Sequence, residues 1–198
     1  MKQLLKDKRK EQIMNAALNV ISVKGYDQSR MDDIVLESDL SKGAIYWYYK
    51  SKKDIYLSLV DHWVSEYSSG MFEALDKTQS ASGKLKKLFD FFYNQFKTNP
   101  ITFKVLVEFW RMASLDDSFN KKLQSIYQDF QDYLIGIIDL GIKEGEFKNV
   151  NSRITALSIL INIEGIHWFT LFDKSGVQAY EYIDTISGFI INGLKKRK

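Results

Sequence analysis

The stretch of residues 29–54, SRMDDIVLESDLSKGAIYWYYKSKKD, constrains the fold most because it holds three helix-start signals in quick succession. Ser29, Ser41 and Ser51 each stand where a helix N-cap belongs, and an aspartate follows the first and the third at the spacing of a capping box. Asp39 lies between the first two helices and tolerates the left-handed backbone of a tight turn. Two short helices joined by a tight turn, with a third following directly, predict a helix-turn-helix.

The second short helix, Ser41 to Tyr49, is predicted to meet double-stranded DNA. Its aromatic run YWYY cannot all face one core, because consecutive helical residues point in different directions. Gly43 and Ala44 leave room for a large partner, and Lys42 and Tyr46 can reach a phosphate or a base edge. The alternative, that part of this run is core, stays open for single rings. The predicted DNA contacts are Ser29, Arg30, Ser41, Lys42, Gly43, Ala44, Tyr46, Trp47, Lys50 and Lys52.

Residues 10–60, and above all LSKGAIYWYYKSKKDI, resemble the DNA-binding domain of the tetracycline-repressor (TetR) family of bacterial transcription regulators. This chain departs from the family pattern at three positions: Asp39 replaces a turn glycine, Ala44 a threonine, and Trp47 a frequent histidine. Two of the three lie on the predicted reading helix, so the operator sequence does not transfer from a relative. The matching positions are Leu40-Ser41, Lys42-Gly43, Ile45-Tyr46, Tyr48-Tyr49 and Lys53-Asp54.

Composition favours an all-α fold and excludes sites that need cysteine. The 198 residues are 45% hydrophobic and contain a single proline, which argues against disorder and for an all-α chain. There is no cysteine, so disulfides and thiolate metal sites are excluded. Residues 1–58 hold eleven Lys and Arg against eight Asp and Glu, a mildly basic front. The polar, charged start predicts a cytoplasmic protein.

Hydrophobic spacing predicts about nine helices in two domains. Residues 1–54 are predicted to form a three-helix DNA-binding domain, and residues 55–198 a helical effector-binding and dimerisation domain. A connecting helix of about 51–75 joins them, and 78–83 reads as a linker. The remaining predicted helices are 6–24, which ends at Gly25, and then 84–97, 101–113, 115–143, 151–172 and 177–195.

No pattern of an enzyme, a cofactor site or a membrane span is found. Glu164 and His167 have the Glu-x-x-His spacing of bundle di-metal sites, but the second half of such a site is missing. The same two residues interrupt the apolar stretch 154–172, which argues against a transmembrane helix. Phosphate-loop and nucleophile-elbow motifs are absent. We therefore expect no metal, no cofactor and no membrane partner.

The back half is rich in large aromatic residues, and the family resemblance implies a small-molecule pocket among them. For any single ring, the simpler interpretation is that it fills the core. The candidate pocket residues are Phe92, Phe96, Phe103, Glu108, Phe109, Trp110, Tyr127, Phe130, Glu164, His167 and Trp168.

The last two helices are apolar on more than one face, which predicts a homodimer through a four-helix bundle and agrees with the resemblance. The candidate interface residues are Ile154, Leu157, Ile161, Ile183, Ile186, Ile190 and Leu194.

These patterns predict a homodimeric, ligand-responsive regulator. It is expected to repress from a palindromic operator and to leave it when a small hydrophobic or amphipathic effector moves the connecting helix. Two alternatives remain. One is an activator, or a regulator without an effector, and the other is a small-molecule carrier whose helix-turn-helix no longer binds DNA.

Overall fold

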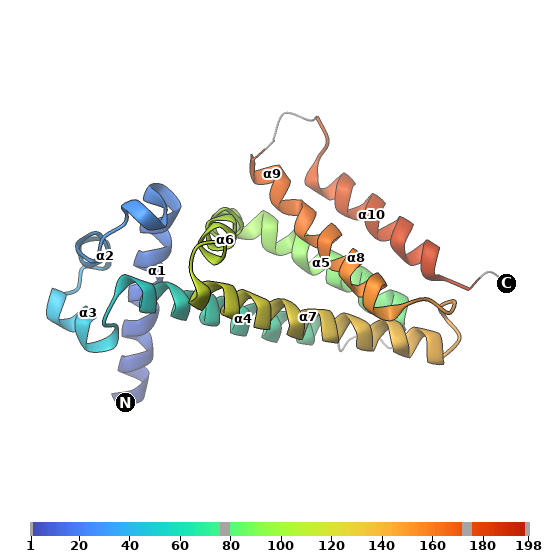
Figure 1. Ribbon diagram of the computed structural model, residues 1–198, viewed down its shortest axis with the longest axis horizontal. Helices are drawn as coiled ribbons and strands as arrows, with labels where there is room; N and C mark the ends of the chain where they lie inside the picture. The colour runs from blue at the N-terminus through green and yellow to red at the C-terminus, as the bar shows by residue number, and fades with distance from the viewer. Residues whose placement is uncertain (1, 76–79, 172–175, 197–198) are drawn as a thin grey trace. The chain divides into compact units, whose positions relative to one another are not determined.

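The computed structural model describes residues 2–75, 80–171 and 176–196, and their regular structure is helical (Figure 1). The all-α prediction is confirmed, and nine helices result when α8, the 3-10 turn η1 and α9 are counted as one interrupted helix. Over these residues, no helix is both long and apolar enough to cross a bilayer. The elements are α1 (Lys2–Gln28), α2 (Met31–Ser38), α3 (Lys42–Tyr48), α4 (Lys52–Leu75), α5 (Ala81–Thr98), α6 (Pro100–Ala113), α7 (Asp117–Lys143), α8 (Ser152–Glu164), η1 (Gly165–His167), α9 (Trp168–Leu171) and α10 (Ala179–Leu194).

Two of the three predicted helix caps form as expected. Ser41 Oγ and Ser51 Oγ each accept the amide three residues later, both at 3.2 Å. The first cap lies one residue further along than predicted. Arg30 is the N-cap of α2, and its backbone N–H donates to the Asp33 carboxylate at 2.8 Å. Ser29 is then free to turn its hydroxyl inward.

Residues with positive φ lie where the sequence predicted turns and helix ends. Asp39 closes α2 with φ 53° and Gly145 follows α7 with φ 74°. Gly25, with φ 72°, kinks α1, and a short helical segment continues to Gln28. Residues 81–83, predicted as part of a linker, instead form the first turn of α5, and the rest of that linker up to residue 79 lies outside the described residues.

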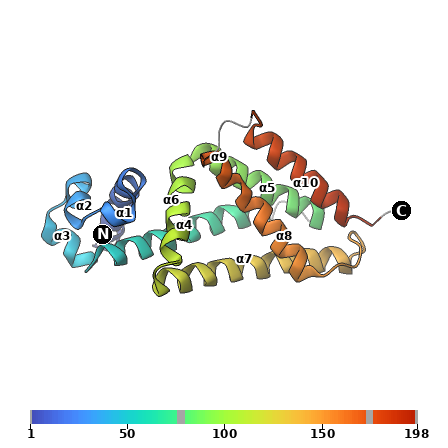
Figure 2. The same cartoon turned by 45° about the horizontal axis from the view of Figure 1, so that its top comes forward.

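The first compact unit is larger than the predicted domain of residues 1–54. It extends to Tyr67 and includes residues 104–122, which hold most of α6 and the start of α7. The physical reason is aromatic packing: the Phe109 ring lies 6.5 Å from that of Tyr56 and 5.7 Å from that of Trp63, both on α4. Within this unit α2 and α3 lie on the same side of α1 (Figures 1 and 2).

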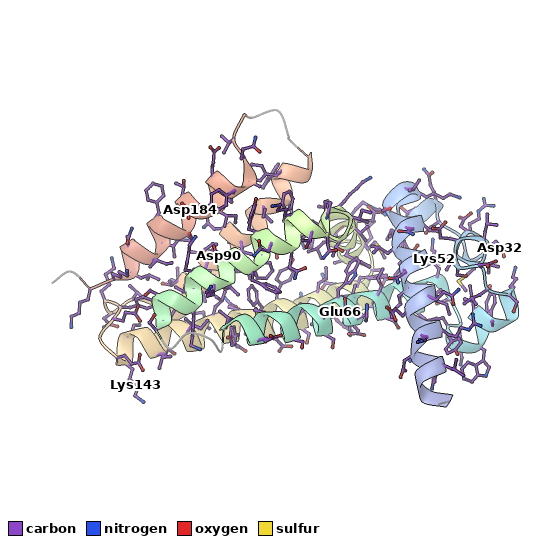
Figure 3. All side chains as sticks on the ribbon, turned by 180° about the vertical axis from the view of Figure 1, so that it is seen from behind. Asp32, Lys52, Glu66, Asp90, Lys143 and Asp184 are labelled. Atoms are coloured by element: carbon purple, nitrogen blue, oxygen red, sulfur yellow. The ribbon has the colours of Figure 1, made fainter. Side chains whose placement is uncertain are left out.

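The second compact unit comprises residues 68–103 and 123–198. Its core is formed by α5, α7, α8 and α10, with fully buried side chains such as Leu88, Leu134 and Ile159. A charged contact joins α5 to α10, because Lys86 Nζ lies 2.9 Å from Asp184, which is labelled in Figure 3.

The loop after α7 ties several elements of the second unit together. The Glu146 carboxylate accepts the backbone amides of Ala81 and Ser82 at 2.8 and 3.0 Å and so caps α5. Lys148 N–H donates to Leu194 O at 2.9 Å, which fixes the end of α10. The unit is therefore closed at this end by backbone and carboxylate hydrogen bonds.

Candidate nucleic-acid interface

The predicted reading helix, α3, is anchored by one face and exposed on the other. Ile45 is fully buried and Tyr49 nearly so, and together they fix α3 against its own unit. Tyr46 and Trp47 are 44% and 70% exposed. The aromatic run thus divides between core and surface, as the helical period requires.

The start of α3 is open to solvent. Ser41, Lys42 and Gly43 are exposed, and no atom lies within 4 Å of a Cβ placed on Gly43. Lys42 Nζ lies 2.7 Å from Asp32 Oδ1 on α2, and this hydrogen bond raises the pKa of the Lys42 ammonium above its usual value. The lysine predicted to face DNA is therefore charged and already paired.

A basic segment of α1 lies beside the reading helix. The Lys6 ammonium is 5.9 Å from the centre of the Trp47 ring, a cation–π arrangement. Lys8 and Arg9 follow on the same helix and are exposed. The sequence-based prediction missed Lys6, although the cluster of basic residues around it was a usable signal.

Ser29 and Lys52 do not lie on the exposed face of α3, which corrects two predicted DNA contacts. Ser29 is buried, and its hydroxyl donates to Tyr26 O at 2.6 Å and accepts from Tyr56 Oη at 3.2 Å. Lys52 Nζ donates to Tyr26 O and Ser29 O at 2.6 and 2.8 Å, and burial lowers its pKa. Burial also raises the pKa of Tyr56 to about 12. These groups hold the turn before α2, so both side chains are engaged by contacts within their own unit.

The predicted contacts that remain form one exposed set, with Ala44 half-buried among them. We call this set the reading surface; it consists of Arg30, Ser41, Lys42, Gly43, Ala44, Tyr46, Trp47 and Lys50.

Several candidate effector residues gather in the core of the second unit. The Phe103 ring is buried and lies 5.5 Å from Phe96 and 5.1 Å from the His167 imidazole. His167 Nε2 is 2.8 Å from Glu164 Oε2. Phe92 and Phe130 form another ring pair at 5.5 Å, and Tyr127 packs against the same core. This aromatic cluster, with one acid–imidazole pair beside it, is the part of the predicted pocket that the structure brings together.

Four other pocket candidates lie elsewhere. Glu108, Phe109 and Trp110 belong to the first unit, where Phe109 is fully buried and Glu108 accepts the Tyr26 amide at 3.0 Å. Trp168 is exposed. Composition alone cannot indicate that the first three belong to a different compact unit from Phe103.

The predicted dimer residues separate into surface and core. Ile154, Leu157 and Ile161 form an exposed apolar stripe on α8. Ile183 and Leu194 are buried in the subunit's own core, which corrects their assignment to an interface. Ile186 and Ile190 are half-buried. Phe189, which the prediction omitted, is 71% exposed on α10.

Over the described ranges, no group of three or more His, Cys, Asp or Glu side chains is arranged to hold a metal ion. Glu164 and His167 form a pair, with His167 Nε2 2.8 Å from Glu164 Oε2.

Comparison with known proteins places these features in a family. A family model described as bacterial regulatory proteins of the tetR family matches residues 13–59, from α1 to α4. The helix-turn-helix-type transcriptional regulator YfiR of Bacillus subtilis is 27% identical over 194 residues, covering 91% of this chain and 93% of its own. A transcriptional regulator from Saccharomonospora viridis, solved in complex with choline, has a TM-score of 0.85 at 22% identity and covers 96% of this chain and 100% of its own. The regulator FadR of Bacillus subtilis, solved with stearoyl-CoA, has a TM-score of 0.83 at 22% identity, with coverages of 93% and 98%.

Proposed function

This chain belongs to the TetR family of helix-turn-helix transcription regulators and is not an enzyme, and we propose that it is a repressor released from its operator by a small amphipathic effector. In this proposal a homodimer binds a palindromic site. Each subunit places α3 in a major groove, and the two reading helices lie one helical turn of DNA apart, about 34 Å.

The observation that carries the proposal is the outer face of α3. Tyr46 and Trp47 are exposed there with Lys42 and Lys50 at the two ends, although a monomeric surface gains nothing from exposed rings. A tyrosine hydroxyl and lysine ammonium groups suit phosphate and base-edge contacts. Rings on a helix held rigidly by Ile45 and Tyr49 can present that chemistry without a loss of internal packing.

The exposed stripe on α8 supports the homodimer. Ile154, Leu157 and Ile161 lie at helical spacing on one side, and Phe189 adds an exposed ring on α10. Apolar side chains of this size on a surface indicate an interface between proteins. A second copy is the partner that a two-fold operator requires.

The aromatic cluster of the second unit supports an amphipathic effector. Phe96 and Phe103 offer apolar contacts, and Glu164 and His167 add a polar pair at the same place. Two proteins with this fold were solved with choline and with stearoyl-CoA, so a ligand with both an apolar and a charged part is the class to test first.

The DNA-binding part is tested with a duplex from the region upstream of the chain's own gene. Fluorescence anisotropy should show that Tyr46→Ala weakens binding about tenfold or more and Lys42→Ala several-fold, as expected for lost phosphate and base contacts. Tyr180→Ala, which truncates an exposed tyrosine of α10, is the matched control and should bind like wild type. Sedimentation should give the same dimer for all of them.

If Tyr46→Ala and Lys42→Ala both kept wild-type operator affinity, the assignment of the reading helix would be wrong. If the wild-type protein bound choline or an acyl-CoA but did not bind the upstream duplex, the small-molecule carrier would become the better interpretation. A thermal-shift screen with these two ligands tests the effector part separately.

A further inference from the structure

Lys42, at the start of the reading helix, is held by a carboxylate of the neighbouring helix. Its Nζ lies 2.7 Å from Asp32 Oδ1, and the two side chains are 59% and 71% exposed. Asp32 is labelled in Figure 3 on α2. The contact therefore bridges the two helices of the helix-turn-helix at the edge of the reading surface.

The pair is not needed to hold α2 and α3 together. Ion pairs between exposed side chains contribute little to stability, because water screens them and the long side chains lose freedom. Each helix is already anchored by a fully buried side chain, Ile34 on α2 and Ile45 on α3. The next residue, Asp33, makes a similar contact with Lys24 at 2.7 Å, away from α3. The contact therefore matters less for stability than for what the Lys42 ammonium presents at the surface.

A lysine paired with a carboxylate responds differently to phosphates and to bases. A phosphate that approaches Lys42 also approaches the negative charge of Asp32, which repels it. An ammonium group has three donors, so Lys42 can keep Asp32 on one and still donate to the uncharged N7 and O6 acceptors of a guanine. Asp32 thus weakens phosphate contacts, which every DNA sequence offers, more than it weakens a guanine contact, which only a G·C pair offers.

We propose that Asp32 is a specificity-determining residue, which holds Lys42 for base contact and lowers the affinity of the protein for non-operator DNA. This inference rests on the proposed DNA-binding function and adds a repulsive element to it. The raised pKa of Lys42 agrees with it, since the ammonium stays charged and paired at neutral pH.

The test compares Asp32→Asn with wild type on two duplexes of equal length and composition, one carrying the operator and one scrambled. We expect the variant to bind the scrambled duplex about fivefold more tightly, the effect of one unit charge a few ångströms away in water. Operator affinity should change less than about twofold. The salt dependence of scrambled-duplex binding should steepen by about one released counterion.

Two further variants serve as controls. Asp132→Asn makes the same charge change at an exposed position of α7 and should leave both affinities unchanged. In a Lys42→Ala background, Asp32→Asn should lose most of its effect, because the ammonium through which Asp32 acts is gone. An equal gain on both duplexes, or the same gain from Asp132→Asn, would overturn the proposal.

Amine labelling separates failure of this inference from failure of the proposed function. Loss of Asp32 should lower the pKa of Lys42, so limiting acetic anhydride should label Lys42 faster in Asp32→Asn while the Lys24 rate stays the same. Unchanged labelling of Lys42, with operator binding intact, rejects the Asp32–Lys42 pair and leaves the regulator standing. Faster labelling of Lys42 in Asp32→Asn, together with a wild-type protein that binds neither duplex, rejects the DNA-binding function, and the specificity role falls with it.

Discussion

The two compact units each contain a glutamate paired with a basic residue one helical turn later. In the first unit, Glu108 Oε1 lies 2.9 Å from Arg111 on α6; in the second, Glu164 Oε2 lies 2.8 Å from His167 across the end of α8. The glutamate side chains are similarly covered, with 24% and 21% exposed. The sequence analysis predicted both glutamates as effector contacts, yet their surroundings differ.

The difference lies in what else the pairs touch and in the chemistry of the base. Glu108 also accepts the Tyr26 amide at 3.0 Å, and Arg111 binds Asp27 at 2.8 Å, so this pair fastens the last segment of α1 to α6. We call Glu108, Arg111, Asp27 and the Tyr26 amide the clasp. A guanidinium cannot lose its proton in a protein, and it donates from a rigid planar fork. The clasp is thus a fixed tie between α1 and α6, whereas the Glu164–His167 pair lies beside the Phe103 ring.

The strongest test of the clasp is Glu108→Ala. Its removal leaves the Tyr26 amide without its acceptor and the Arg111 guanidinium with Asp27 alone, and we expect the free energy of unfolding to fall by about 2–3 kcal/mol. Urea denaturation followed by circular dichroism measures this, and hydrogen exchange at the Tyr26 amide should accelerate.

The matched control is Glu66→Ala. Glu66, labelled in Figure 3, pairs with His62 on α4 at 3.4 Å and is largely exposed. An exposed pair of this kind contributes about 0.5 kcal/mol or less. Equal losses in the two variants would mean that the clasp is only a surface ion pair.

A second test uses the glycine beside the clasp. Gly25 has φ 72°, and a Cβ there would lie 3.3 Å from Glu108 Oε1. Gly145 has φ 74° but no neighbouring atom within 4 Å. We expect Gly145→Ala to cost about 1 kcal/mol from backbone strain, and Gly25→Ala about 2 kcal/mol, because it also displaces the carboxylate. Chemical denaturation of both variants gives the difference, and identical costs would remove the crowding argument.

Sequence reasoning succeeded where the signal was local. The caps at Ser41 and Ser51, the left-handed Asp39 and the divided aromatic run all depend on neighbours within a turn or two. It failed at Ser29 and Lys52, because their hydrogen-bond partner Tyr26 is held by the packing of distant rings such as Phe119. The sequence shows that Ser29 and Lys52 are polar, but only their tertiary contacts show that both side chains point inward.

In helices that are apolar on several faces, the sequence cannot separate core residues from interface residues. Ile183 and Ile161 looked alike as interface residues, yet the first is buried in the subunit's own core and the second is exposed. Periodicity predicts that such helices need two partners, but it does not say which face meets which partner. The same ambiguity assigned Phe109 to an effector pocket, whereas it fills the core of the first unit.

The third prediction concerns acid stability. Arg111 and the Tyr26 amide hold the pKa of Glu108 below its usual 4.5. Because the folded-state pKa is lowered, the stabilisation is complete above the pKa of an unfolded glutamate and is lost as the pH falls through the folded value. Glu108→Gln should therefore be less stable than wild type by about 1–2 kcal/mol at pH 7. Urea denaturation should show that the gap is constant down to about pH 5 and shrinks below it; a gap that persisted at low pH would assign the effect to packing and not to charge.

The smallest expected change in stability is at the other pair. Glu164→Gln should lower the free energy of unfolding by less than about 1 kcal/mol, because the amide keeps the shape of the carboxylate and its oxygen can still accept a hydrogen bond from the His167 ring. The same variant should reduce the thermal shift produced by choline more than that produced by an acyl-CoA, since only a cationic group needs the carboxylate. Thermal denaturation with and without each ligand measures both effects, and Glu108→Gln, which alters the clasp only, should keep both ligand shifts. A loss of stability at Glu164 as large as that at Glu108 would show that both pairs are structural ties and would leave the aromatic cluster around Phe103 without a polar contact for an effector.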